Sequence, residues 1–158
     1  MQEFSRSLPM MLYRTLDAVM PRFREIFKAF GLTEQQWRVL RVLWQREPIP
    51  FRELADLTLI PAPSLVGVID RLSRSGLVAR SRSDKDRRNV FVHATKKGRA
   101  LESKVMPRVN KAYAELRRSV DATTWESLIA GLEKISSIGD EAGGKPAVNN
   151  NPTKVGEV

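Results

Sequence analysis

Basic residues are concentrated in one segment of this 158-residue chain. Residues 62–99 hold 10 of its 27 Lys and Arg but only 3 of its 18 Asp and Glu. The flanking segments are nearly balanced, with 9 basic and 7 acidic residues over 1–61 and 8 of each over 100–158. Such a local surplus of positive charge is typical of proteins that bind the phosphates of nucleic acid. An anionic membrane surface is the other partner that it favours.

Two further arginines, Arg14 and Arg38, stand in otherwise apolar helical patterns. A guanidinium in such a place must meet either water or an anion, and its fork of N–H donors matches a carboxylate. Either side chain could therefore bind an acid group. Ion pairs between two subunits are the alternative.

The chain offers few groups for catalysis or metal binding. A single His and no Cys exclude zinc fingers, iron–sulfur clusters and thiol chemistry. The carboxylates of Asp84 and Asp86 lie among basic residues that would repel a cation, and His93 has no second His or Cys with which to share a metal. We therefore predict no metal site, no cofactor and no enzymatic activity.

The elements that must position these groups are mostly helical. Apolar residues recur every three or four positions from about 4 to 30 and over 33–47. A short helix is predicted over 51–58, and a break that includes two prolines separates it from another helix over 63–75. This order is helix, tight turn, helix.

Two short β-rich runs follow, over 77–82 and 89–94, with a charged segment between them. They predict a hairpin with a basic tip. Two more helices are expected over about 95–138. Residues 139–158 are rich in Gly, Asn and Pro and lack an apolar period, which predicts a disordered tail.

The elements together predict a mainly α fold with a small β-hairpin wing, a winged helix-turn-helix whose second helix enters the major groove of DNA. We expect one domain over 1–138, with the winged helix-turn-helix lobe at about 33–94. The helices at about 4–30 and 95–138 carry apolar stripes too extensive for one small lobe, so they predict a homodimer.

One set of residues, running from the end of the second helix of the helix-turn-helix through the wing, has a specific pattern. Its members are Asp70, Arg71, Leu72, Ser75, Gly76, Leu77, Val78, Arg82, Asp84 to Arg88, Val90, Val92, Thr95 and Gly98. With this pattern the sequence resembles the MarR family of bacterial transcriptional regulators over about residues 5–138. The runs 32–38 and 63–65 look like the branch of the homoprotocatechuate-degradation operon repressor, which generally controls the catabolism of aromatic acids.

The resemblance implies that the second helix of the helix-turn-helix reads DNA. Ser64 could bond to a base edge or a phosphate, Val66 could contact a thymine methyl, and Gly67 would permit close backbone approach. Part of the specificity is expected to come from DNA shape. The expected DNA-binding residues are Pro63, Ser64, Val66, Gly67, Arg71, Arg74, Arg87 and Arg88.

The wing has its own expected roles. Arg87 is the candidate for the minor groove. Asp86 and Arg88 look like the ion pair of the family's wing, with Asp70 as a further partner. A solvated run of charges is the alternative, since an exposed ion pair contributes only about 0 to 1 kcal/mol.

In the resembling family, the effector pocket lies between the dimerisation helices and the DNA-binding lobe, and an arginine of the second helix commonly meets the acid of the ligand. Arg38 is therefore the first candidate for effector binding and Arg14 the second. Trp37 adjoins the same region, although core packing is the default for an aromatic residue on an apolar face.

We therefore expect a cytoplasmic, homodimeric repressor of a catabolic operon. It would bind a double-stranded, pseudo-palindromic operator and leave it when a small aromatic or heteroaromatic carboxylate binds. A sequence-tolerant architectural DNA-binding protein without an effector is the alternative. A membrane partner is disfavoured because the densest basic cluster lies on a hairpin, not along an amphipathic helix, and no apolar run reaches the ~18 residues of a bilayer span.

Overall fold

The computed structural model describes residues 4–82 and 90–143 of the chain, with side chains up to residue 138. The chain forms two compact units, Met1–Tyr113 and Ala114–Val158. This division concerns contacts within one chain. It does not test the expected single domain over 1–138, which stays a prediction. The predicted wing tip at 83–88 lies outside the described residues, as does most of the predicted tail.

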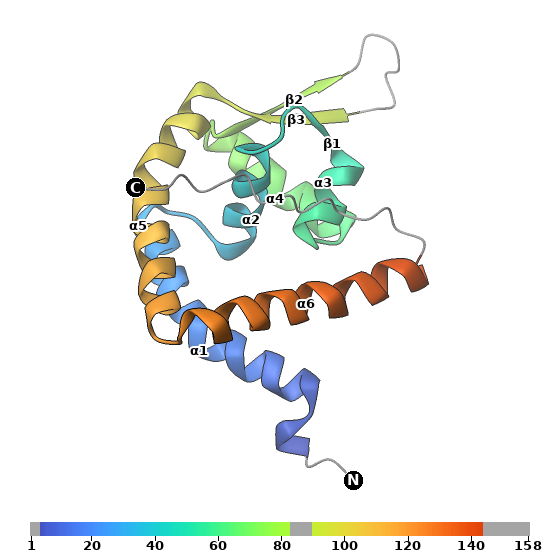
Figure 1. The fold of residues 1–158 in the computed structure, drawn as a ribbon. Helices are drawn as coiled ribbons and strands as arrows, with labels where there is room; N and C mark the ends of the chain where they lie inside the picture. The colour runs from blue at the N-terminus through green and yellow to red at the C-terminus, as the bar shows by residue number, and fades with distance from the viewer. Residues whose placement is uncertain (1–3, 83–89, 144–158) are drawn as a thin grey trace. The chain divides into compact units, whose positions relative to one another are not determined.

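Helices dominate the first unit (Figure 1). The expected helix over 4–30 is divided into a 3-10 turn and α1, because the backbone of Ser7 is extended and a proline occupies the first turn of α1. The second predicted helix ends at Leu43, earlier than residue 47. The helices are η1 Phe4–Arg6, α1 Leu8–Ala29, α2 Glu34–Leu43, α3 Phe51–Thr58, α4 Ala62–Arg74 and α5 Lys96–Arg118, which continues into the second unit.

Local signals set the ends of these helices. The Thr33 hydroxyl accepts a hydrogen bond from the Gln36 amide at 3.2 Å, and the Gln36 side chain accepts one from the Thr33 amide at 2.9 Å. This is a capping box at the start of α2. Gly31 follows α1 with φ +68°, and Gly76 follows α4 with φ +71°. Both adopt the left-handed conformation that glycine accommodates at a helix end.

The sheet has one strand more than the sequence predicts. Strands β2 (Val78–Arg82) and β3 (Val90–Ala94) form the antiparallel pair of the wing, in which Arg80 lies opposite Val92. Strand β1 (Ile49–Pro50) pairs with the other edge of β3, so the order is β1-β3-β2. A strand of two residues that includes a proline has no alternation from which it could be predicted.

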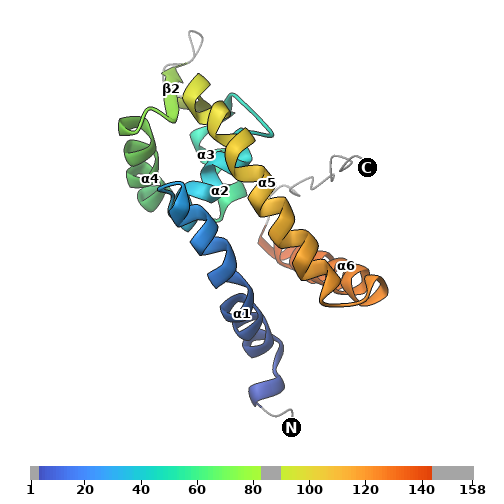
Figure 2. The same ribbon diagram turned by 90° about the vertical axis from the view of Figure 1, so that its left-hand side faces the viewer.

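The core of the first unit lies between α2, α3, α4 and the sheet. Side chains without any exposed surface come from α2, α3, α4, β3 and α5, and they include Leu40, Leu43, Leu54, Leu65, Ile69, Leu72, Val92 and Val105. The N-terminal half of α1, by contrast, extends beyond the other helices of this unit (Figures 1 and 2). Its apolar residues Leu8, Met11, Leu12 and Leu16 are exposed.

The start of α5 is joined closely to the end of α4. Gly98 is buried, and a Cβ at this position would lie 2.1 Å from the carbonyl oxygen of Leu77. The Thr95 hydroxyl donates to the Gly76 carbonyl at 2.6 Å, and the Lys97 ammonium donates to the Ser75 carbonyl at 2.8 Å. Only a glycine permits the backbone of α5 to approach the backbone of Leu77, just before β2, this closely.

Residues just after α2 complete this junction. The indole N–H of Trp44 donates to the Gly98 carbonyl at 3.0 Å. Glu47 accepts a hydrogen bond from the Ala94 amide at 2.6 Å and forms an ion pair with Arg99. Four segments therefore meet at one place: the ends of α2, α4 and β3 and the start of α5.

In the second unit, α6 covers Ala122–Gly143. The Asp121 carboxylate caps the helix by accepting bonds from the Thr124 amide at 2.9 Å and the Thr124 hydroxyl at 2.6 Å, and these bonds lower the pKa of Asp121. The helix extends past Ile138, so the tail predicted over 139–158 begins too early. The residues Asp140, Glu141 and Ala142 lack an apolar period, but their types are tolerated in a helix, so α6 continues through them.

No helix within the described ranges is both long enough and apolar enough to span a membrane.

Gly98→Ala tests the close approach of α5 to the end of α4. We expect a loss of about 3 kcal/mol in the free energy of unfolding, measured by urea denaturation, because the new methyl group meets a backbone carbonyl. Gly131→Ala is the control, since a Cβ at Gly131 meets nothing within 4 Å and alanine favours the helix by up to about 1 kcal/mol. Equal stability of the two variants would contradict the packing described.

Candidate nucleic-acid interface

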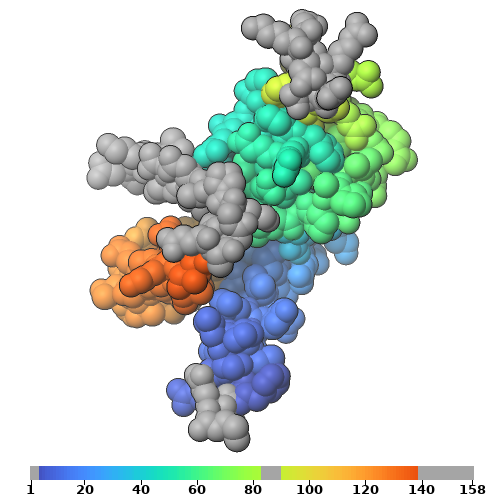
Figure 3. Space-filling model, turned by 90° about the vertical axis from the view of Figure 1, so that its right-hand side faces the viewer, coloured from blue at the N-terminus to red at the C-terminus, as the bar shows by residue number. Residues whose placement is uncertain are grey.

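The two faces of α4 differ sharply in exposure. Leu65, Val68, Ile69 and Leu72 are completely buried, as their helical spacing predicts. The candidate DNA-binding residues of this helix lie outside the core: Gly67 is half-buried, and Pro63, Ser64, Val66, Arg71 and Arg74 are exposed. Figure 3 shows the surfaces of α3 and α4 adjoining on one face of the unit. The exposed face of α4 is therefore accessible to a large partner such as DNA, whose groove could receive the helix.

Gly67 is not required by the packing of α4. A Cβ there would lie 3.4 Å from the nearest atom, Nη1 of Arg71, which is the end of a flexible side chain. The half-buried backbone of Gly67 lies beside this movable Arg71 guanidinium. The expected role of Gly67 in close approach to DNA stays a prediction.

An ion pair at the base of the wing involves Asp70, which the sequence suggests as a further partner of the wing, and an arginine that it does not suggest. Asp70 of α4 accepts a hydrogen bond from Arg80 of β2 at 2.6 Å, and both side chains are partly exposed. The expected partners Asp86 and Arg88, and the minor-groove candidate Arg87, lie outside the described residues. Arg80 was missed because ten positions separate it from Asp70 and only the sheet brings it beside α4.

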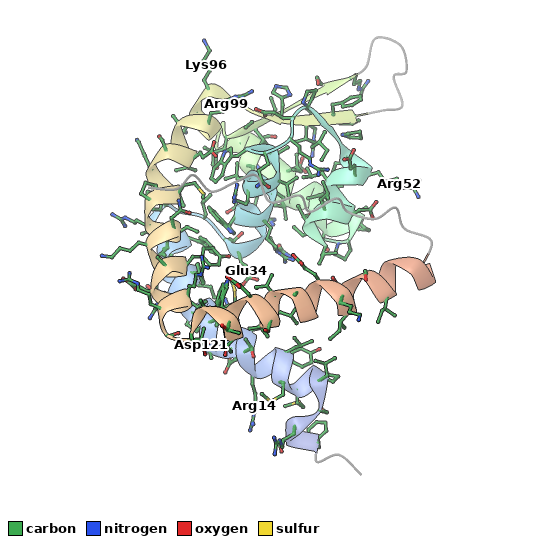
Figure 4. All side chains as sticks on the ribbon, viewed as in Figure 1. Arg14, Glu34, Arg52, Lys96, Arg99 and Asp121 are labelled. Carbon is green, nitrogen blue, oxygen red and sulfur yellow. The ribbon has the colours of Figure 1, made fainter. Side chains whose placement is uncertain are left out.

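A cavity of about 620 Å³ lies between α3, α4 and the wing. Three arginines line it, Arg52, Arg80 and Arg82, over apolar side chains that include Phe51 and Val66. Arg52 points away from α3 toward solvent (Figure 4). Sequence reasoning missed Arg52 and Arg82 because they lie in different elements. Together they give the exposed face of α4 a positively charged border, which suits a phosphate backbone.

Aromatic side chains connect α1, α2 and α5. The rings of Trp37 and Phe27 stack with centroids 4.7 Å apart, and the edge of Trp44 meets Trp37 at 5.6 Å. Phe23 contacts Tyr113 at 4.7 Å. Trp37 therefore packs against other aromatic rings and is still partly exposed. The same ring can thus belong to the core and also contact a ligand.

The two arginines predicted to bind an effector have different environments. Arg14 is exposed and points away from α1 (Figure 4). Arg38 is half-buried, and its Nη1 donates to the Thr58 carbonyl at the end of α3, at 3.0 Å. The structure does not bring these two side chains together in one chain. Part of the donor capacity of Arg38 is already used inside the protein.

Arg41 is a third arginine near this region, and sequence reasoning missed it. It lies four residues after Trp37 on α2, so the two side chains share one face of the helix. Arg41 is half-buried and forms no hydrogen bond or ion pair with another residue in the described ranges. Its spacing from Trp37 was the signal that could have identified it.

No group of three or more His, Asp or Glu side chains in the described part of the chain could hold a metal ion.

Comparison with known proteins places this architecture in a family. The sequence profile of the MarR family matches residues 32–90. The homoprotocatechuate degradative operon repressor of Escherichia coli is 34% identical over 134 residues, which are 85% of this chain and 90% of that repressor. The chain belongs to the MarR family. The expected fold, a winged helix-turn-helix regulator of this family, is confirmed.

Solved structures of other MarR-family regulators agree with this assignment. NadR in complex with 4-hydroxyphenylacetate has a TM-score of 0.75 and 30% identity, over 87% of this chain and 98% of that one. The repressor CouR bound to a 23-mer DNA duplex has a TM-score of 0.79 and 28% identity, over 86% and 96%. The MarR-type relatives of this chain are thus transcription regulators, and the two structures contain an aromatic acid and a DNA duplex.

The ion pair between Asp70 and Arg80 can be tested by a double-mutant cycle. Asp70→Asn, Arg80→Met and the double variant should show a coupling of less than about 1 kcal/mol in the free energy of unfolding, because both side chains are partly exposed. Urea denaturation at low and high salt measures it. A coupling of several kcal/mol that salt does not reduce would contradict this weak, solvent-screened pair.

Proposed function

We propose that this chain is a homodimeric repressor of a catabolic operon, that it binds a pseudo-palindromic DNA operator, and that a small aromatic carboxylate releases it. The observation that carries the proposal is the exposed face of α4 bordered by Arg52, Arg80 and Arg82. A protruding helix beside a basic border fits the major groove and its flanking phosphates. The similarity to the DNA-bound CouR supports the same use of this face.

Exposed apolar residues on two helices support the homodimer. On α1 they are Leu8, Met11, Leu12 and Leu16, and on α6 they are Leu128, Ile129, Ile135 and Ile138. A soluble protein rarely leaves so many apolar side chains of a helix in water. A symmetric dimer would cover them and would present two copies of α4 to two half-sites about one helical turn apart.

We assign the carboxylate of the effector to Arg41, and Arg14 stays the second candidate that the sequence offers. Arg41 has no partner in the described ranges and shares a helix face with Trp37, whose ring gives an aromatic ligand an apolar surface. Arg38, the candidate favoured by the sequence, uses Nη1 to hold the Thr58 carbonyl. The aromatic acid in the similar structure of NadR supports this ligand class.

A sequence-tolerant architectural DNA-binding protein would use the same basic border but would need no effector. The two functions separate in a binding assay with a palindrome that the protein selects from a random pool. A specific repressor should prefer that palindrome over random duplex by roughly 10³ or more. A ratio near one would favour the architectural function.

The helix and the cationic border should make different contributions to DNA binding. Arg52→Ala should weaken binding to every sequence and reduce the salt slope by about 0.9, because it removes one phosphate contact. Ser64→Ala should instead change the preference among single-base variants of the palindrome. Fluorescence anisotropy at several salt concentrations measures both. The control is Arg24→Ala, because Arg24 is an exposed arginine of α1 that pairs with Glu34. If all three variants change DNA binding in the same way, the separate roles of α4 and the cationic border are wrong.

The effector assignment predicts that Arg41→Met weakens the binding of 4-hydroxyphenylacetate by about ten- to a hundredfold, since a charge-assisted contact to a carboxylate is lost. Calorimetry measures this affinity. The neutral amide of the same ligand should bind wild type about as weakly as the acid binds Arg41→Met. The amide should bind Arg41→Met and wild type with nearly the same affinity, because the carboxylate contact is already absent. Equal binding of acid and amide by wild type would exclude a carboxylate contact.

A further inference from the structure

The turn between α3 and α4 has an unusual residue at its centre. Leu59 adopts the left-handed conformation, with φ 52° and ψ 35°, and its side chain is 78% exposed. It is the only residue other than glycine with positive φ in the described ranges. This conformation is costly for a residue with a Cβ, and burial of the side chain does not compensate here. Other contacts must therefore hold the turn.

Backbone hydrogen bonds supply part of this support. The amides of Leu59 and Ile60 donate to the carbonyls of Asp56 and Ala55, each at the long distance of 3.3 Å. Ile60 is buried, and Pro61 follows it directly before α4. The carbonyl of Thr58, immediately before Leu59, needs a donor from elsewhere, because the last carbonyls of a helix have no intrahelical partner.

Arg38 is that donor. Its Nη1 reaches the Thr58 carbonyl at 3.0 Å from α2, across 20 positions of sequence. Its Nε is buried without a hydrogen-bond partner among the residues that the structure describes. A cation beside the last carbonyls of a helix also interacts favourably with the helix dipole. The Arg38 guanidinium therefore contacts the start of the turn through Nη1, while its buried Nε–H makes no hydrogen bond in the described part of the chain.

Lys97 makes a comparable contact at the other end of α4, where its ammonium donates to the Ser75 carbonyl at 2.8 Å. A cationic side chain from another element therefore holds the chain on each side of α4. This repeated arrangement indicates that the position of α4, and not only the stability of α3, depends on such contacts.

We propose that Arg38 is a positioning residue for DNA recognition. Through the Thr58 carbonyl it fixes the conformation of Leu59, and the turn then determines where α4 begins and which face it presents. The inference rests on the proposed function, since it assumes that α4 reads DNA. It gives Arg38 a role distinct from effector binding.

The test compares Arg38→Met, which removes every donor at similar length, with Arg38→Lys, which keeps a cation of the kind that Lys97 uses. Arg24→Met is the matched control on the exposed side of α1. Arg38→Met should bind the selected palindrome about tenfold more weakly but random duplex within about twofold of wild type. Arg38→Lys should recover most of the loss, and the thermal midpoint should report any general loss of stability.

Amide hydrogen exchange gives a second measurement without DNA. In Arg38→Met the amides of Leu59 and Ile60 should exchange about tenfold faster, while those of the α2 core should not change. Equal weakening of both duplexes together with a lower thermal midpoint would make Arg38 a general stabiliser and overturn the proposal. Unchanged exchange would also overturn it.

The two proposals fail in different ways. If wild type does not distinguish the selected palindrome from random duplex, the proposed function fails. Exchange at Leu59 and Ile60 then still decides whether Arg38 holds the turn.

Discussion

The first unit depends on the contact between the backbone of Leu77 and Gly98. At this point the end of α4, the start of β2 and the first turn of α5 are so close that a methyl group cannot be placed between them. Trp44 and Glu47 connect the end of α2 to the same place. The end of the helix with the exposed DNA-reading candidates is therefore held directly against the first turn of the long helix α5.

Much of this architecture follows from local chemistry. The capping box at Thr33, the glycines at 31 and 76 and the apolar spacing of α4 each determine structure through residues a few positions away, and all were predictable. The strand β1, the pair of Asp70 with Arg80 and the bond from Arg38 to Thr58 depend on residues far apart in the sequence. A single sequence has no local pattern that reports such contacts.

The candidate site shows the same division. The exposed face of α4 was predictable, because a helix that buries one stripe must expose the opposite one. The arginines that border it were only partly predictable, since Arg52 belongs to α3 and Arg80 and Arg82 to β2. For the effector, sequence reasoning proposed an arginine of α2, and the proposal of Arg41 in place of Arg38 required knowing what each side chain contacts.

The short strand β1 also affects how the protein behaves at high concentration. Without it, β3 would be an edge strand, whose unpaired amides and carbonyls could pair with a strand of another molecule. Ile49 and Pro50 occupy that edge opposite Val92 and Phe91. Because the ring of Pro50 leaves no amide hydrogen and the strand has only two residues, the sheet cannot easily be extended on this side. A segment too small to define the fold thus disfavours pairing of another molecule's strand at this one edge of the sheet.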